Sequence, residues 1–113
     1  MLVVKMRVEN MLKKENLKFG SILVEQYGYS MTLYNFYKVV RISGSKVDLL
    51  PLKHKVTKSH GWLQFEVKPI NVNAWMQKNV ISKRISKYGL KGTCNSYMSI
   101  YDEKHEYIKD YAD

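Results

Sequence analysis

The sequence predicts a mainly β protein: a small, partly open β-barrel of the SH3-like type, with five to six strands and a short N-terminal helix. Short segments that alternate between apolar and polar residues recur along the chain. Glycine-containing or polar turns separate them at intervals of about ten residues, a spacing typical of small barrels and sandwiches. With 113 residues, the chain is long enough for one domain with a modest core and too short for two.

The single domain, residues 1–113, is expected to have three parts. Residues 1–16 carry apolar side chains at helical spacing, which predicts a short amphipathic helix, although the first half of this segment fits an edge strand equally well. The barrel core is expected over residues 17–101. Residues 102–113 hold five acidic residues against two lysines and are expected to form an acidic tail.

The first half of the core contains three predicted strands. Residues 21–27 form a strand that ends at Gly28, where the absence of a Cβ favours a turn or bulge. Residues 35–43 alternate between apolar and basic or aromatic side chains, Gly44-Ser45 is a hairpin signal, and the third strand follows over residues 46–52.

The second half of the core is predicted to hold the remaining strands. Residues 51–58 are rich in lysine and are expected to form a basic loop or a strand edge. Residues 62–67 show the clearest two-residue alternation in the chain. Residues 79–86 and 93–101 complete the set. Phe36 and Trp62 are expected to pack in the core.

The charge balance points to an anionic partner. The chain has nineteen basic and ten acidic residues, which gives a net charge of +9. A basic balance of this kind is typical of nucleic-acid-binding proteins. Only three of the nineteen are arginines, and lysine suits phosphate oxygens better than base edges. Contacts with the nucleic-acid backbone should therefore outweigh base reading. The composition of an AT-rich genome is an alternative source of the lysines.

The residues expected to contact nucleic acid lie in the first turn and on the basic strands. Aromatic side chains beside a basic track hold single-stranded nucleic acid by stacking and phosphate attraction. Filling of the barrel core is the alternative role of the tyrosines. The candidate contacts are Tyr29, Tyr34, Lys38, Arg41, Lys53, Lys55, Lys58, Lys83, Arg84 and Lys87.

The first turn also carries a family resemblance. Residues 28–37 read Gly-Tyr-x-x-Thr-x-x-x-Phe-Tyr, and with residues 17–23 and the strand after the turn they resemble a family of small phage and mobile-element proteins. Residues 100–107 are similar to that family's closing hairpin. Most polar residues of the family's turn are replaced here by Ser30, Met31 and Leu33. The resemblance implies a phage-like origin and a β-barrel fold, and it implies no enzymatic activity.

No motif in the chain predicts catalysis, a metal or a cofactor. The histidines and Cys94 form no C-x-x-C or H-x-x-x-H pair, whereas a zinc site needs three or four ligands. Cys94 is expected to be a small buried hydrophobic residue unless the fold brings a histidine beside it. The single cysteine fits a reducing compartment, and no apolar run approaches the length of a membrane span. We therefore expect a cytoplasmic protein of a bacterial host cell, without a membrane partner.

Two functions fit these observations. The first is a non-catalytic nucleic-acid-binding protein of phage or mobile-element origin that contacts phosphates through a lysine-rich face. The second is an anti-defence protein that inhibits a host nuclease, such as a CRISPR effector or a restriction enzyme, by contacting the protein or its guide RNA. The oligomeric state stays open, because Trp75 fits an interface and a core position equally well.

Overall fold

The computed structural model describes residues 16–28, 31–71 and 79–110, and in these ranges the chain is mainly β-structure with no α-helix. The helix predicted over residues 1–16 and the role of Trp75 thus fall outside the described residues, apart from Asn16. The described residues form eight strands: β1 (Ile22–Tyr27), β2 (Leu33–Ser43), β3 (Lys46–Leu52), β4 (His54–Gly61), β5 (Gln64–Pro69), β6 (Ile81–Arg84), β7 (Met98–Ile100) and β8 (Ile108–Asp110).

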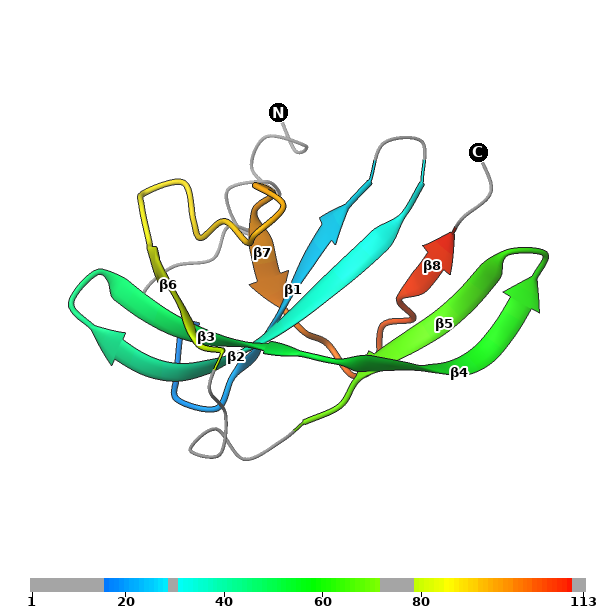
Figure 1. The fold of residues 1–113 in the computed structure, drawn as a ribbon, viewed down its shortest axis with the longest axis horizontal. Helices are drawn as coiled ribbons and strands as arrows, with labels where there is room; N and C mark the ends of the chain where they lie inside the picture. The colour runs from blue at the N-terminus through cyan, green and yellow to red at the C-terminus, as the bar shows by residue number, and fades with distance from the viewer. Residues whose placement is uncertain (1–15, 29–30, 72–78, 111–113) are drawn as a thin grey trace.

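The strands form two antiparallel sheets that do not close into a barrel (Figure 1). The first sheet has the order β6-β3-β2-β1-β7, and the second has the order β4-β5-β8. Only Lys53 separates β3 from β4, so the chain passes from one sheet to the other almost as one continuous strand. A second link joins Thr32 to Asp110, whose backbone N–H groups donate to each other's carbonyl oxygens at 3.0 and 2.8 Å.

Both faces of the first sheet bury apolar side chains, because successive residues of a strand point to opposite faces. Tyr37 and Phe36, adjacent in β2, are each 1% exposed and belong to different cores. The segment between β6 and β7 covers the first face and contributes Leu90. The second sheet contributes Val67 and Tyr107 to the core on the other face. This second core joins the two sheets into one folded unit.

A buried glutamate fixes the segment between β6 and β7. Glu25, in β1, is fully buried, and its carboxylate accepts hydrogen bonds from the backbone N–H groups of Cys94 (3.1 Å) and Ser96 (3.0 Å). Asn35 Nδ2 and the Tyr37 hydroxyl, on β2, donate to the same group at 3.0 Å each. A buried polar group costs free energy unless hydrogen bonds replace its water shell. These four donors therefore make Glu25 an anchor for the loop.

The loop approaches Glu25 closely because Gly92 has no side chain. A Cβ at Gly92 would overlap the Glu25 carboxylate atoms. The next residue, Thr93, donates its backbone N–H to the Tyr37 hydroxyl at 3.1 Å, and the two hydroxyl oxygens lie 2.7 Å apart. Glycine at position 92 is thus a packing requirement of this buried polar cluster.

The sequence predictions for the first three strands and their hairpin are confirmed. Gly44 adopts a φ of 61° at the β2–β3 turn, which only glycine adopts without strain. Strand β8, in the segment expected as an acidic tail, was missed. Strand β4, in the segment expected as a basic loop or a strand edge, is an edge strand of the second sheet. Residues 16–28, 31–71 and 79–110 consequently hold eight strands where five or six were expected. The SH3-like assignment is taken up below as a proposal.

Two core predictions have opposite outcomes. Phe36 is buried in the second core, as expected. Trp62 is 80% exposed, so its predicted core position is wrong. It lies in the β4–β5 turn together with Leu63, which has a φ of 59°. The alternation that predicted a strand from residue 62 begins only at Gln64.

Candidate nucleic-acid interface

The basic residues that the sequence places on one face lie on different faces of the strands. Strands β3 and β4 continue one alternation, in which Leu50 and Leu52 point to the second core. Asp48 lies on that same face, as does the predicted contact Arg41 directly opposite it on β2, whereas Lys53 and Lys55 lie on the other face. The single lysine-rich face expected from the sequence is therefore divided into separate groups.

The first group lies at the end of the five-stranded sheet and consists of Arg41, Lys46 and Arg84. All three side chains are exposed. Lys46 is directly opposite Arg84 on β6, and Arg41 is directly opposite Asp48 on β3. The Asp48 carboxylate also accepts a hydrogen bond from the Ser82 hydroxyl at 2.6 Å. An acidic residue thus lies in the middle of this group, which we call the sheet-end group.

The second group lies on the β4–β5 hairpin and on the link that precedes it. We call its four members, all exposed, the hairpin lysines: Lys53, Lys55, Lys58 and Lys68. Lys55 lies directly opposite Lys68 in the ladder. Like charges in directly opposed positions destabilise a pair of strands, and a bound anion between them would remove that cost. Sequence analysis missed Lys68, although its charge and its place directly after the clearest alternation were visible.

A hollow adjoins the opposed pair. Lys55 and Lys68 line an open cavity of about 380 Å³ together with Ile22, Pro69 and Tyr101, and Asn71 and Glu103 complete its wall. Ile22, Pro69 and Tyr101 supply apolar surface beside the two lysines, and Glu103 supplies an opposing carboxylate. A ligand with a flat apolar part and a negative charge, such as a nucleotide, would be attracted by the lysines and opposed by Glu103.

Trp62 adds an aromatic surface at the tip of the same hairpin. Its indole is 80% exposed and Val56, on β4, is 56% exposed. An exposed large aromatic side chain at a hairpin tip is a suitable platform for base stacking, which is sequence-tolerant and worth about 1–3 kcal/mol per base. The hairpin thus combines lysines with an accessible ring.

The first-turn tyrosines do not supply this platform. Tyr29 lies outside the described residues. Tyr34 is only 8% exposed and packs edge-on against Tyr107, with ring centroids 5.4 Å apart. Burial raises the pKa of Tyr34, and the neighbouring Tyr107 adds to that rise. The prediction that Tyr34 is exposed for stacking is therefore wrong, because alternation along β2 directs its ring into the second core.

The other predicted basic contacts are dispersed. Lys38 is half-buried between Ile22 and Leu50 in the ladder. Lys83 is half-buried opposite Val47 and so lies on the face that its neighbour Arg84 does not share. Lys87 lies in a turn, with its Nζ 5.0 Å from the centre of the Tyr88 ring. None of these three belongs to the hairpin group.

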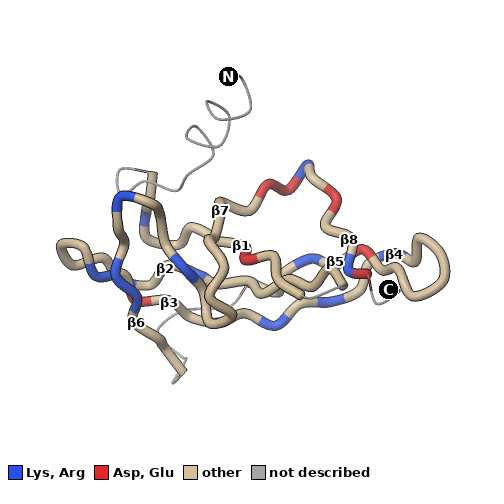
Figure 2. Tube along the Cα trace, turned by 90° about the horizontal axis from the view of Figure 1, so that it is seen from above, with Lys and Arg blue, Asp and Glu red and all other residues tan. Residues whose placement is uncertain are grey.

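Charge is also separated along the molecule (Figure 2). Acidic residues gather in the loop between β7 and β8, which holds Asp102, Glu103 and Glu106 around Lys104. The basic residues follow β2, β3, β6 and the β4–β5 region. A polyanion approaching the hairpin would therefore be repelled from the β7–β8 loop, which would orient its path.

Cys94 and His54 are two of the residues that the sequence offers for catalysis or metal binding, and the structure shows the contacts of each. Cys94 is exposed, so the expectation that it is buried is wrong. Its sulfur accepts a hydrogen bond from Asn35 Nδ2 at 3.3 Å. His54 packs against Phe36, and its Nε2 lies 3.4 Å from Lys109 Nζ. Burial lowers the pKa of His54, and the positive charge of Lys109 lowers it further.

Comparisons with known proteins give no family for the chain. No protein-family model, curated protein or solved structure matches it. The described residues contain no helix that is long and apolar enough to cross a membrane. The case for any function thus depends on the chemistry of the surface described above.

Proposed function

We propose that the protein binds nucleic acid without catalysing a reaction, and that the β4–β5 hairpin is its main contact. The hairpin lysines would bind phosphates while Trp62 stacks on a base. The observation that carries this proposal is that one hairpin holds both an opposed pair of lysines, Lys55 and Lys68, and the exposed indole of Trp62. Two like charges held side by side on exposed strands form a site for a phosphate group, at a cost to the free protein that binding repays.

Single-stranded nucleic acid is the better fit to this surface. Recognition of a base edge in a duplex groove relies largely on arginine, asparagine and glutamine side chains. The hairpin instead offers lysines and an exposed indole, which match the phosphate track and stacking platform of single-strand binders. The proposed binding is accordingly strong in its salt dependence and weak in its sequence preference.

The proposed architecture for this function is a partly open barrel of the SH3-like type. The nearly continuous β3–β4 strand and the Thr32–Asp110 link join the two sheets at two places, and the second core lies between them. This arrangement supports the assignment. A phage or mobile-element origin is proposed on the sequence resemblance alone, which covers residues 17–23, residues 28–37 with the strand that follows, and residues 100–107.

Fluorescence anisotropy with random-sequence DNA and RNA, single-stranded and duplex, tests the proposal over about 50–300 mM salt. We expect binding at the low end that weakens steeply as salt rises, with single strands bound more tightly than duplexes. Absence of binding to every probe at the lowest salt would refute the proposal. In that event the exposed Trp62 and Val56 would favour the second function, in which the hairpin contacts an acidic surface of a host nuclease.

A further inference from the structure

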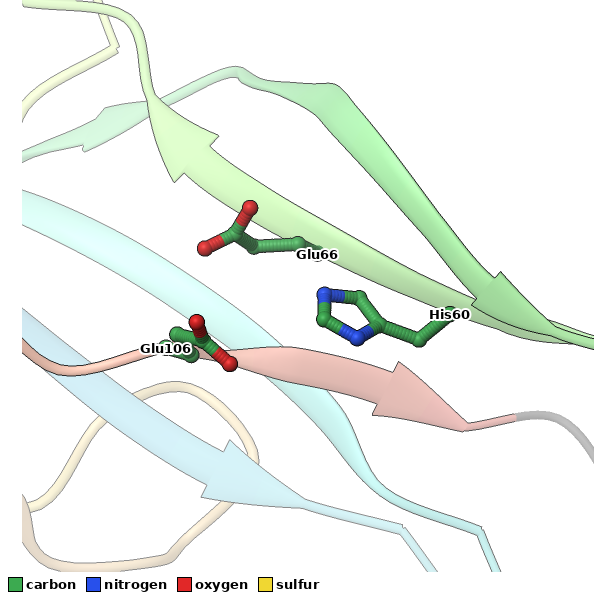
Figure 3. Close-up of side chains that lie close together, drawn as sticks. All are labelled: His60, Glu66 and Glu106. Carbon is green, nitrogen blue, oxygen red and sulfur yellow. The ribbon is translucent and has the colours of Figure 1, made fainter.

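Three potential metal ligands converge at the second sheet. His60 from β4, Glu66 from β5 and Glu106 from the segment before β8 each place one ligand atom within 4.8 Å of the others. Figure 3 shows the imidazole ring extending from the end of β4 toward the two carboxylates, one from β5 and the other from the segment just before β8. We call these three residues the His-Glu-Glu cluster.

The strand register places all three side chains on one face. Glu66 is directly opposite Ile108 on β8, so Glu106, two residues before Ile108, lies on the same face as Glu66. Lys58 is directly opposite Glu66 on β4, and His60 lies two residues farther along that strand. The cluster is therefore a consequence of the pairing of β4, β5 and β8.

Two irregularities of β4 adjust this geometry. The ladder with β5 shifts by one residue between Val56 and Lys58 and again between Ser59 and Gly61, which makes Thr57 and His60 the extra residues. Such bulges commonly redirect a side chain at a functional site. The Thr57 hydroxyl donates to Glu66 Oε2 at 3.1 Å. One bulge thus supplies a ligand, and the other supplies an outer hydrogen bond that orients a second ligand.

His60 has an unsatisfied group at this point. Its Nε2 is shielded from solvent and has no hydrogen-bond partner among the described residues. Buried polar atoms are nearly always paired, and an unpaired one calls for an explanation such as an ion. An imidazole nitrogen is also the commonest nitrogen ligand of metals in proteins.

The local charge favours a cation. Two carboxylates lie together in a chain of net charge +9, and Lys58, opposite Glu66, compensates only one of them. Glu66, Glu106 and Lys58 together keep one negative charge. A divalent ion would remove the repulsion between the carboxylates and give Nε2 a partner at the same time.

We propose that His60, Glu66 and Glu106 bind a divalent transition-metal ion, with zinc as the best match. One imidazole nitrogen and two carboxylate oxygens are a ligand set that zinc accepts at about 2.0–2.2 Å. Tetrahedral ligands at these bond lengths lie roughly 3.4 Å apart. The three ligand atoms already lie within 4.8 Å of one another, so an adjustment of about 1.4 Å at most brings any pair to this spacing. Three protein ligands leave a coordination position for water.

The test is isothermal titration calorimetry with zinc in a Cys94→Ser background, because the exposed Cys94 thiol is itself a zinc ligand. We expect one zinc ion per chain and a rise in melting temperature when zinc is present, because an ion that binds only the folded state stabilises it. His60→Gln and Glu106→Gln should each weaken zinc binding by at least about tenfold, because even changes to outer-shell partners reach this size.

Two variants in the β7–β8 loop, which also carries Glu106, provide matched controls. Glu103→Gln and His105→Gln remove the same kinds of side chain from exposed positions outside the cluster, and they should leave zinc affinity unchanged. The proposal is overturned if zinc produces neither heat nor thermal stabilisation at about 100 µM free zinc. It is also overturned if His60→Gln and Glu106→Gln bind zinc as tightly as the controls do. Neither readout involves nucleic acid, so the result is independent of the proposed function.

Discussion

Replacement of the opposed hairpin lysines should change how nucleic-acid binding responds to salt. The logarithm of the affinity for a single strand falls with the logarithm of salt concentration, with a slope of about −0.7 per phosphate contacted. If each of the four hairpin lysines contacts one phosphate, the slope is about −2.8, and Lys55→Gln/Lys68→Gln reduces it to about −1.4. Between 50 and 200 mM salt, the affinity should then fall about 50-fold for the wild type and about 7-fold for the variant.

The sheet-end group supplies a control of equal charge. Lys46→Gln/Arg84→Gln also removes two exposed, directly opposed basic residues, so it changes the net charge by the same amount. We expect this variant to keep a slope close to that of the wild type when anisotropy is measured with the same labelled single strand. If the sheet-end variant instead has the reduced slope while Lys55→Gln/Lys68→Gln keeps the wild-type value, the assignment of the interface to the hairpin is wrong.

Three further predictions concern the buried polar cluster around Glu25, the half-buried His54 and the exposed indole of Trp62. Gly92→Ala should lower the free energy of unfolding by about 2 kcal/mol, because its Cβ would overlap the Glu25 carboxylate; an unchanged urea midpoint would contradict this. The lowered pKa of His54 means that, below its ordinary value of 6.5, the folded protein binds fewer protons than the unfolded chain. The stability that His54 contributes above pH 6.5 should therefore be lost as the pH falls through the folded-state pKa of His54. The loss should be at most about 1.4 kcal/mol per pH unit. The free energy of unfolding, measured with urea from pH 7.5 to 5, should depend less on pH in His54→Gln than in the wild type. Parallel pH dependences of the two proteins would show that His54 is not the source of the effect. Trp62→Ala should weaken single-strand binding in anisotropy by about 1–3 kcal/mol and leave the melting temperature unchanged; equal affinity would exclude stacking on Trp62.

The strands that the sequence predicts well are those in which burial alternates regularly. In β1, β2 and β3 the apolar side chains point to two covered faces, and glycine or small polar residues mark the turns. Strand β4 differs because it is mostly exposed. Its bulges at Thr57 and His60 also interrupt the two-residue period. The lysine-rich sequence of this segment therefore predicted a basic loop or a strand edge, although the segment pairs with β5 along most of its length.

The closing strand and the metal ligands were hidden for a related reason. Strand β8 has three residues in an acidic segment, which is too short for a periodic signal. Its place is set by pairing with β5 and by the burial of Tyr107 in the second core. Because His60, Glu66 and Glu106 come from three segments, no local spacing brings them together. Their convergence is a property of strand pairing and could not be predicted from local pattern.

The candidate interface was predicted in part. The charge count drew attention to Lys53, Lys55 and Lys58, which are exposed on the β4–β5 hairpin and the link that precedes it. Their contact with nucleic acid stays a prediction. The sequence alone also grouped them with Lys83 and Arg84. Separating these two residues from the hairpin lysines required knowledge of the strand and the face that each residue occupies. Glu25 carried one signal, a carboxylate within an otherwise apolar stretch of β1, which is typical of a buried polar anchor.

An NMR titration of the labelled protein with a random-sequence single-stranded oligonucleotide at low salt tests the proposed interface most directly. We predict that the largest changes in amide chemical shift occur over residues 53–68, accompanied by a shift of the Trp62 indole N–H. The Lys46 and Arg84 amides should change little. Absence of shifts at saturating oligonucleotide, or changes concentrated at Arg41, Lys46 and Arg84, would contradict the assignment of nucleic-acid binding to the β4–β5 hairpin.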